Sequence, residues 1–313
     1  MPRISVMIPT FNCARFLGLA IDSVLTQTYH DYEIVVVDDG STDDTRECIA
    51  KYGAKVRYFY QTNQGLSAAR NLALDHATGE FIAYVDADDM WFPGKLEAQV
   101  AFLDSHRECG LVHTEVSVID EQGKVIHARF NQGTGRSVPQ GKCLNDLLRS
   151  CHIQVPTVME RRSWLDKAGR FDLRLVAAQD YLHWIMLALA GAEVGYIGQA
   201  LAMYRWRQSS LMSSQSRFVR DLCTIYRILL TETTVEKSHG LDIERLIRSQ
   251  YYEHRRRLAY LDRIEGRKSL AVDNLYSLIK ENPFNVELYV DLFKAFAWEY
   301  VKSVRGGKER TFV

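Results

Sequence analysis

The sequence has 313 residues, of which 47% are hydrophobic, and its 39 Lys and Arg residues balance 39 Asp and Glu residues. This neutral balance does not favour nucleic acid as a partner, and the length allows a sizeable core with more than one structural unit. Six scattered Cys residues without C-x-x-C spacing favour reduced thiols over a disulfide framework or a structural zinc site.

The first hundred residues alternate short apolar runs with stretches of helical periodicity. We expect strands at 4–8, 34–37, 56–60 and 81–85, and helices at 15–25, 42–52 and 67–76. Such an alternating order predicts a parallel sheet covered by helices. In open sheets of this class, ligands bind at the carboxyl ends of the strands.

Each of these expected strands ends in a polar cluster. The four clusters are Pro9-Thr10-Phe11-Asn12, Asp38-Asp39-Gly40-Ser41-Thr42-Asp43, Thr62-Asn63-Gln64-Gly65 and Asp86-Ala87-Asp88-Asp89. Because the carboxyl ends of parallel strands share one edge of the sheet, all four clusters should face one crevice. This convergence predicts a binding site.

Three carboxylates crowd the last cluster. Repulsion among Asp86, Asp88 and Asp89 costs free energy unless a cation, a helix N-terminus or hydrogen-bond donors compensate. Mg²⁺ and Mn²⁺ prefer oxygen ligands and usually bind through one or two carboxylates together with substrate phosphates. The D-x-D pair Asp86 and Asp88 is therefore a candidate cation site, with a plain turn as the alternative.

The glycine-rich phosphate loops of other nucleotide enzymes are missing. No G-x-G-x-x-G follows the first strand, and no G-x-x-x-x-G-K-[ST] occurs anywhere. A dinucleotide oxidoreductase or a P-loop enzyme is therefore disfavoured.

The rest of the sequence changes character near residue 215. We expect strands at 111–113 and 117–119, a hairpin turn at 120–124, a loop at 131–135, a helix at 181–190 and an almost wholly helical region from 216. No apolar stretch is long enough for a membrane span, and the start of the chain shows no signal peptide pattern. These features predict a cytoplasmic protein, with peripheral contact at the inner face of the membrane left open.

Several spaced motifs together resemble one known family. The stretches ISVMIPTFNCARFLGLAIDSVLTQTYHDYEIVVVDDGSTDDT, NQGLSAARNLAL, GEFIAYVDADD and FDLRL are similar to the family-2 glycosyltransferases with the GT-A fold, over residues 1 to about 210. The resemblance implies an α/β fold with a mostly parallel, Rossmann-like sheet flanked by helices. It also implies a nucleotide-sugar-binding half at 1–110 and an acceptor-binding half at 111–215. The helical pattern from 216 separately predicts a helical C-terminal appendage at 216–313.

The resemblance assigns roles position by position. It places Pro9, Thr10 and Asn12 in a nucleotide-contacting loop, Asp39 at the uracil edge, Gln64, Gly65 and Arg70 against the nucleotide and its phosphates, Asp86 on the ribose or metal, and Asp88 on Mn²⁺ or Mg²⁺. Each residue taken alone also has a structural reading as a turn, a cap or a solvated side chain.

The reaction that the resemblance implies is an inverting transfer, which needs a general base near the acceptor. Asp180 matches the family's acidic pair and is the candidate base, although it could also cap the helix that follows; Gln179 departs from the usual Glu. Arg207 stands where many relatives carry His. It cannot ligate a cation, but its fork of donors can bind phosphate oxygens.

These expectations describe an enzyme that transfers one sugar from a nucleotide-diphosphate sugar, with UDP favoured, to a saccharide or a lipid-linked acceptor. Two alternatives stay open at this point. One is a sugar-phosphate nucleotidyltransferase, which would need a basic glycine-rich loop after the first strand. The other is a nucleotide-sugar-binding protein without transferase activity, in which Gln179 and Arg207 mark the loss of catalysis.

Overall fold

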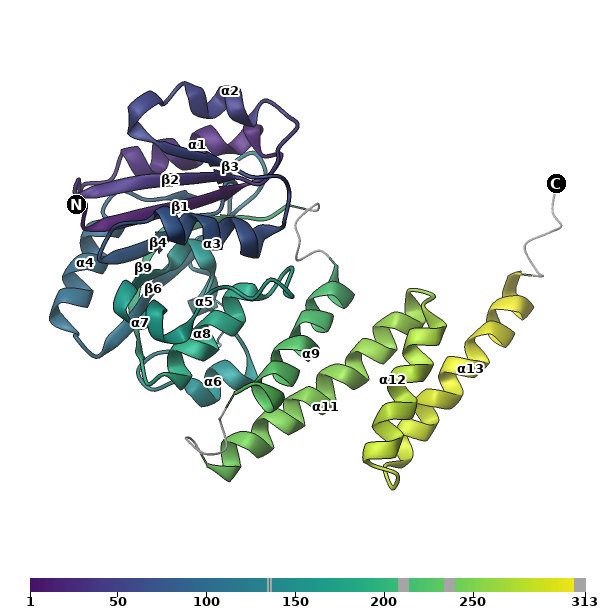
Figure 1. Ribbon diagram of the computed structural model, residues 1–313. Helices are drawn as coiled ribbons and strands as arrows, with labels where there is room; N and C mark the ends of the chain where they lie inside the picture. Colours follow the sequence, from purple (N-terminus) through teal and green to yellow (C-terminus); the bar gives the residue numbers. More distant parts are fainter. Residues whose placement is uncertain (134, 136, 208–213, 234–239, 307–313) are drawn as a thin grey trace, which may run out of the picture. The chain divides into compact units, whose positions relative to one another are not determined.

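The computed structural model describes residues 1–133, 135, 137–207, 214–233 and 240–306 (Figure 1). The chain forms two compact units, at 1–210 and 211–313.

In the described residues of the first unit, nine strands form one mixed sheet. They are β1 (Ile4–Thr10), β2 (Tyr32–Asp38), β3 (Arg57–Tyr60), β4 (Phe81–Tyr84), β5 (Met90–Trp91), β6 (Cys109–Ile119), β7 (Val125–His127), β8 (Met159–Arg161) and β9 (Glu193–Arg205). The order is β3-β2-β1-β4-β8-β6-β9-β5, and β7 pairs with β6.

The first four strands run parallel, as the alternating sequence pattern predicts. The chain moves outward from β1 to β3 through α1 (Ala14–Leu25) and α2 (Thr45–Ala50), and then returns to β4 through α3 (Leu66–His76). Right-handed crossovers therefore place α1 and α2 on one face of these strands and α3 on the other (Figure 1). The strand order reverses between β1 and β4, which is where sheets of this class bind ligands.

Beyond β4 the sheet is no longer mostly parallel. Strand β8 is antiparallel to both β4 and β6, whereas β6 and β9 run parallel. The helices of this part are α4 (Lys95–Ser105), α5 (Phe130–Gly133), α6 (Leu144–Arg149), α7 (Arg162–Ala168) and α8 (Gln179–Leu189). Short 3-10 turns lie at Gly53–Lys55 and Val155–Thr157.

Two local expectations were wrong in this part. The strands expected at 111–113 and 117–119 form one continuous strand, β6, and the loop expected at 131–135 begins as α5. Glu115 explains both differences, because it is fully buried and its carboxylate accepts the backbone N–H groups of Asn131 and Gln132 at 2.9 and 3.0 Å. Glu115 therefore stays inside the strand as a buried hydrogen-bond acceptor, at a position where a polar residue usually indicates that a strand ends. The hairpin turn at 120–124 is confirmed, since Asp120 N donates to the Lys124 carbonyl.

The main core lies between the parallel strands and the helices that cover them. Ile4, Val6, Val36 and Ala83 of the strands are fully shielded from solvent, and Leu17 of α1 packs in the same cluster. Burial of this kind contributes roughly 25 cal/mol per Å² of apolar surface. The core therefore fixes the strand ends from which the polar clusters emerge.

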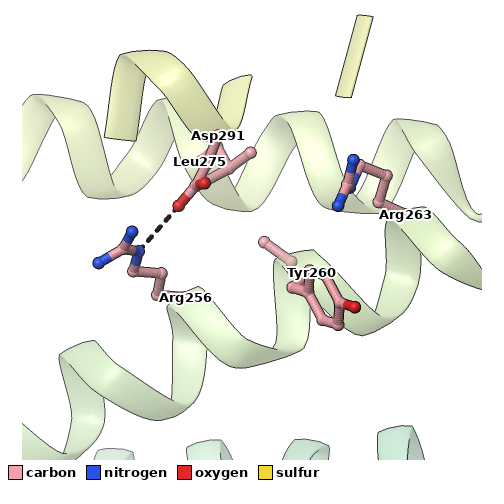
Figure 2. Close-up of a pocket in the computed structure, with 6 residues that line it drawn as sticks. Arg256, Tyr260, Arg263, Leu275 and Asp291 are labelled. Atoms are coloured by element: carbon pink, nitrogen blue, oxygen red, sulfur yellow. Dashed lines mark hydrogen bonds and ion pairs between the residues drawn. The ribbon is translucent and has the colours of Figure 1, made fainter. Parts of the chain in front are cut away.

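The second unit contains α9 (Gln215–Thr231), α11 (Leu241–Ile264), α12 (Lys268–Glu281) and α13 (Val286–Gly306). A small cluster that includes Ala259, Leu275 and Leu288 packs α11, α12 and α13 together. Beside it is a cavity of about 20 Å³, where Arg256 donates to Asp291 at 2.8 Å (Figure 2). Such a volume has room for about one water molecule and is too small for a substrate.

Among the described residues, every helix is too short or too polar to cross a bilayer.

Candidate active site

The loops that follow β1 and β2 hold each other in place. Asn12 has a left-handed backbone (φ 49°), which Asn tolerates better than most residues, and its side-chain oxygen accepts the Thr42 N–H at 2.7 Å. The Ser41 hydroxyl accepts the Asn12 N–H at 2.9 Å. Pro9 and Thr10 are buried just before this loop, and the Thr10 hydroxyl has no partner among the described atoms. Pro9, Thr10 and Asn12 therefore lie together at the reversal of the strand order.

Asp39 organises the loop that enters α3. Its buried carboxylate accepts the side-chain N–H of Gln61 at 2.6 Å and the backbone N–H groups of Gln64 and Gly65, each at 2.8 Å. Two of these bonds reach Oδ1 and one reaches Oδ2, so Oδ2 can accept one further donor. Asp39, Gln64 and Gly65 are thus brought into one group.

Arg70 links α3 to the end of β4. Its side chain is only 2% exposed, one nitrogen donates to Asp86 Oδ1 at 2.9 Å, and the guanidinium lies over the Phe171 ring, 5.5 Å from its centroid. The remaining Nε and Nη1 of Arg70 are buried and have no partner among the described residues. Unsatisfied buried donors are costly, so this guanidinium is suited to a ligand that supplies oxygen acceptors, such as a phosphate.

The other two carboxylates of the crowded cluster meet the end of β9. Asp88 Oδ2 is 2.5 Å from Arg207 Nη2, and Asp89 Oδ1 accepts the Arg205 backbone N–H at 2.8 Å. Arg205 Nε also donates to the Asp88 carbonyl at 2.8 Å. Arg205 therefore holds the cluster through the Asp88 carbonyl and through the carboxylate of Asp89, which is only 1% exposed.

Burial and mutual repulsion act on these carboxyl groups. Burial raises the pKa of Asp88, the charge of Asp86 raises it further, and the Arg207 guanidinium opposes both effects. Burial also raises the pKa of Asp89 well above its usual range, with Asp88 and Asp86 adding to the shift. The negative charges of the three carboxylates are therefore not fully balanced by the arginine side chains nearby.

Asp180 lies in the first turn of α8, the position that the sequence predicts. Burial raises its pKa, the positive charge of Arg70 lowers it, and the negative charge of Asp86 raises it. Arg70 and Asp86 therefore lie close enough to Asp180 for their charges to act on it. Gln179 beside it is 2% exposed, and its side-chain oxygen has no hydrogen-bond partner among the described residues.

A buried network behind the site was not foreseen. Glu160 on β8 is fully buried, and its carboxylate accepts hydrogen bonds from the Tyr84 hydroxyl and from His183 Nε2, the latter at 3.0 Å. Tyr84 ends β4, two residues before Asp86, and His183 lies on α8, three residues after Asp180. Glu160 therefore joins the two elements that carry these carboxylates. The only sequence signal was the position of Tyr84 and His183 next to motif residues.

The described residues contain no group of three or more His, Cys, Asp or Glu side chains arranged to hold a metal ion. A two-carboxylate site remains compatible with Mg²⁺ or Mn²⁺, because these ions take their other ligands from water and substrate phosphates. Burial and the negative charge of Asp86 raise the pKa of Asp88. A divalent cation between the two carboxylates would relieve their mutual repulsion. The donor set thus fits such an ion.

Comparison with known proteins decides the family. The profile described as "Glycosyl transferase family 2" matches residues 5–167, just over half of the chain. The chain belongs to glycosyl transferase family 2. Among family relatives, the Bacillus subtilis proteins EpsE and TuaG are 36% and 30% identical, over 67% and 72% of this chain and 74% and 88% of their own lengths. An uncharacterized Rickettsia felis glycosyltransferase is 35% identical over 65% of this chain, but the match spans about a third (33%) of its length.

Solved structures show the same fold. The Staphylococcus aureus TarS fragment 1–349 is 22% identical with a TM-score of 0.63, covering 99% of this chain and 94% of its own. The mannosyltransferase PcManGT of Pyrobaculum calidifontis is 19% identical with a TM-score of 0.61, covering 97% and 82%. The family and the α/β GT-A fold class, both expected from the sequence, are confirmed. The roles of the individual site residues remain predictions.

Proposed function

We propose that this family-2 member is an inverting glycosyltransferase. It transfers one sugar from a nucleoside diphosphate sugar to a hydroxyl group of a saccharide or lipid-linked acceptor. The observation that carries the proposal is the meeting of Asp86, Arg70 and Asp180 at the reversal of the strand order, where a buried guanidinium has two donors left for a ligand. Phosphate recognition and a general base are the two functions that the reaction demands.

In the proposed reaction, the acceptor oxygen attacks the anomeric carbon while the bond from that carbon to the diphosphate oxygen breaks. The bonding electrons leave with the nucleoside diphosphate, and Asp180 takes the proton of the acceptor hydroxyl. The burial-raised pKa of Asp180 makes it a better proton acceptor than an ordinary carboxylate. Arg70 and Arg207 would balance the charge on the leaving group, and a divalent cation held by Asp86 and Asp88 would supply further positive charge.

The binding site for the nucleoside consists of the loops after β1, β2 and β3. In the proposal, Pro9, Thr10 and Asn12 line the base and ribose, and Asp39 Oδ2 accepts an N–H of the base. Gln64 and Gly65 lie beside it, since their backbone N–H groups hold the same carboxylate.

Relatives support the substrate classes. TarS has been solved with UDP-GlcNAc, PcManGT with GDP-Man and Mn²⁺, and TuaG is named for teichuronic acid biosynthesis. We favour a UDP-linked donor and an acceptor in cell-envelope polysaccharide synthesis, which would place the reaction at the cytoplasmic side of the membrane.

The test measures release of nucleoside diphosphate from UDP- and GDP-sugars with Mn²⁺ or Mg²⁺, alongside thermal-shift binding of UDP and GDP. Asp180→Asn should lower turnover by at least about 100-fold while keeping nucleotide binding. Asp146→Asn is the matched control, because Asp146 also lies in the first turn of a helix, α6, and is exposed. Nucleotide binding without turnover of any donor, and with Asp180→Asn equal to wild type, would favour the binding protein instead. Release of pyrophosphate from a nucleoside triphosphate would favour the nucleotidyltransferase.

A further inference from the structure

The end of β9 places a guanidinium on the carboxylate that is expected to hold the cation. Arg207 Nη2 lies 2.5 Å from Asp88 Oδ2, and the two side chains are only 25% and 19% exposed. We propose that Arg207 is an exchangeable counter-ion. It neutralises Asp88 while the donor is absent, and it moves to the donor's diphosphate when a divalent cation takes the carboxylate. This inference rests on the proposed function, because it requires a nucleoside diphosphate ligand.

The main chain of Asp88 is held in place by Arg205. Its carbonyl accepts Arg205 Nε at 2.8 Å, and the next residue, Asp89, accepts the Arg205 backbone N–H. Arg205 is itself anchored, since its Nη1 donates to the Asp120 carbonyl at 2.9 Å and its side chain is buried. The main chain of Asp88 therefore stays in place, and the longer side chain of Arg207 makes the larger movement in the exchange.

Arg207 is placed close to another cation. The guanidinium groups of Arg205 and Arg207 both lie over the ring of Phe16, at 4.8 and 5.5 Å from its centroid. Two guanidinium groups on one ring repel each other unless anions balance them. Asp88 provides that balance for Arg207, so transfer of Asp88 to a cation leaves the guanidinium free to bind an anion nearby.

The exchange couples cation and donor. A cation that arrives alone must displace Arg207 from Asp88 and leave it beside Arg205, which weakens cation binding. A diphosphate that arrives with the cation accepts the displaced guanidinium as a two-pronged hydrogen-bond partner. Each ligand therefore raises the affinity for the other, and the coupling is reciprocal.

Mn²⁺ binding to the nucleotide-free protein tests the exchange directly, by electron paramagnetic resonance of unbound Mn²⁺ and by calorimetry. Arg207→Ala should bind Mn²⁺ about tenfold more tightly than wild type, equivalent to ~1.4 kcal/mol, and the factor by which UDP strengthens Mn²⁺ binding should fall. Arg57→Ala is the matched control, because it also removes a cation paired with a carboxylate, Glu33, but at the opposite edge of the sheet. Arg207→Lys should lie between wild type and Arg207→Ala.

Unchanged or weaker Mn²⁺ affinity in Arg207→Ala overturns the exchange, as does an undiminished effect of UDP. The proposed function fails separately, if neither UDP nor GDP raises the melting temperature of the wild type with or without Mn²⁺. In that case the Mn²⁺ titration of the nucleotide-free protein still reports on whether Arg207 and a cation compete for Asp88.

Discussion

The buried carboxylate of Glu160 provides a quantitative test of how the site is held together. In Glu160→Ala, the Tyr84 hydroxyl and His183 Nε2 both lose their acceptor at a position with no exposed surface. Each buried polar group left unsatisfied costs about 1–3 kcal/mol, so the free energy of unfolding should fall by roughly 2–6 kcal/mol. For a unit of this size, ~1 kcal/mol corresponds to about 2–4 °C, which gives a fall in melting temperature of about 4–24 °C.

Thermal unfolding followed by circular dichroism measures this loss. Glu160→Gln keeps an oxygen that can accept from Tyr84 and an amide that can donate to the other tautomer of His183, so it should lose less. Glu108→Ala removes an exposed carboxylate and should change stability by less than about 0.5 kcal/mol. A Glu160→Ala protein that melts within about 2 °C of wild type would refute the reasoning, because the carboxylate would then not be the acceptor of the network.

Three further outcomes follow from the site. Protonated Asp180 cannot act as a base, and burial raises its pKa. As the pH decreases, turnover should therefore begin to fall at a pH above the ordinary carboxyl pKa of about 3.9. A loss of turnover only at or below that pH would contradict the assignment. Asp88→Ala should abolish the Mn²⁺-dependent part of UDP binding in a thermal-shift titration, whereas Asp89→Ala should reduce it less, and the reverse order would exchange their roles. Gly40→Ala should destabilise the fold by at least about 1 kcal/mol, since Gly40 has φ +83° and an added Cβ would lie 2.7 Å from the Asn63 backbone nitrogen; an unchanged melting temperature would show that the loop relaxes.

The sequence predicts the first half of the fold well for a physical reason. Strands buried on both faces, such as β1 and β2, need continuous apolar runs, and the polar residues that follow these runs mark where the strands end. In the second half, buried polar residues interrupt the apolar pattern of the strands. Glu115 and His113 are fully buried inside β6, and burial of polar groups depends on partners that lie far away in the sequence. Local patterns carry no information about such partners.

The same limit applies to the site. Residue types and spacing indicate which side chains gather at the strand ends, and the structure brings Asp39, Arg70, Asp86, Asp88 and Asp180 to one edge of the sheet. The sequence does not reveal how charges are paired there. That Arg207 contacts Asp88 depends on β9, a strand that pairs with β6 and ends beside the D-x-D loop.

Strand β9 imposes a constraint on chain length as well as on charge. Arg205 and Arg207 both turn toward Phe16, while Trp206 between them is 53% exposed. From Ala202 to Arg205 the pairing with β6 is regular, so insertion or deletion of a single residue in this stretch would place an indole where the cations lie. Before Ala202 the pairing has irregularities that already absorb extra residues of β9, so a change in residue number there does not by itself reverse the faces. Alignments of this region with other family members should therefore be judged first by the number of residues from Ala202 onward, and only then by residue type.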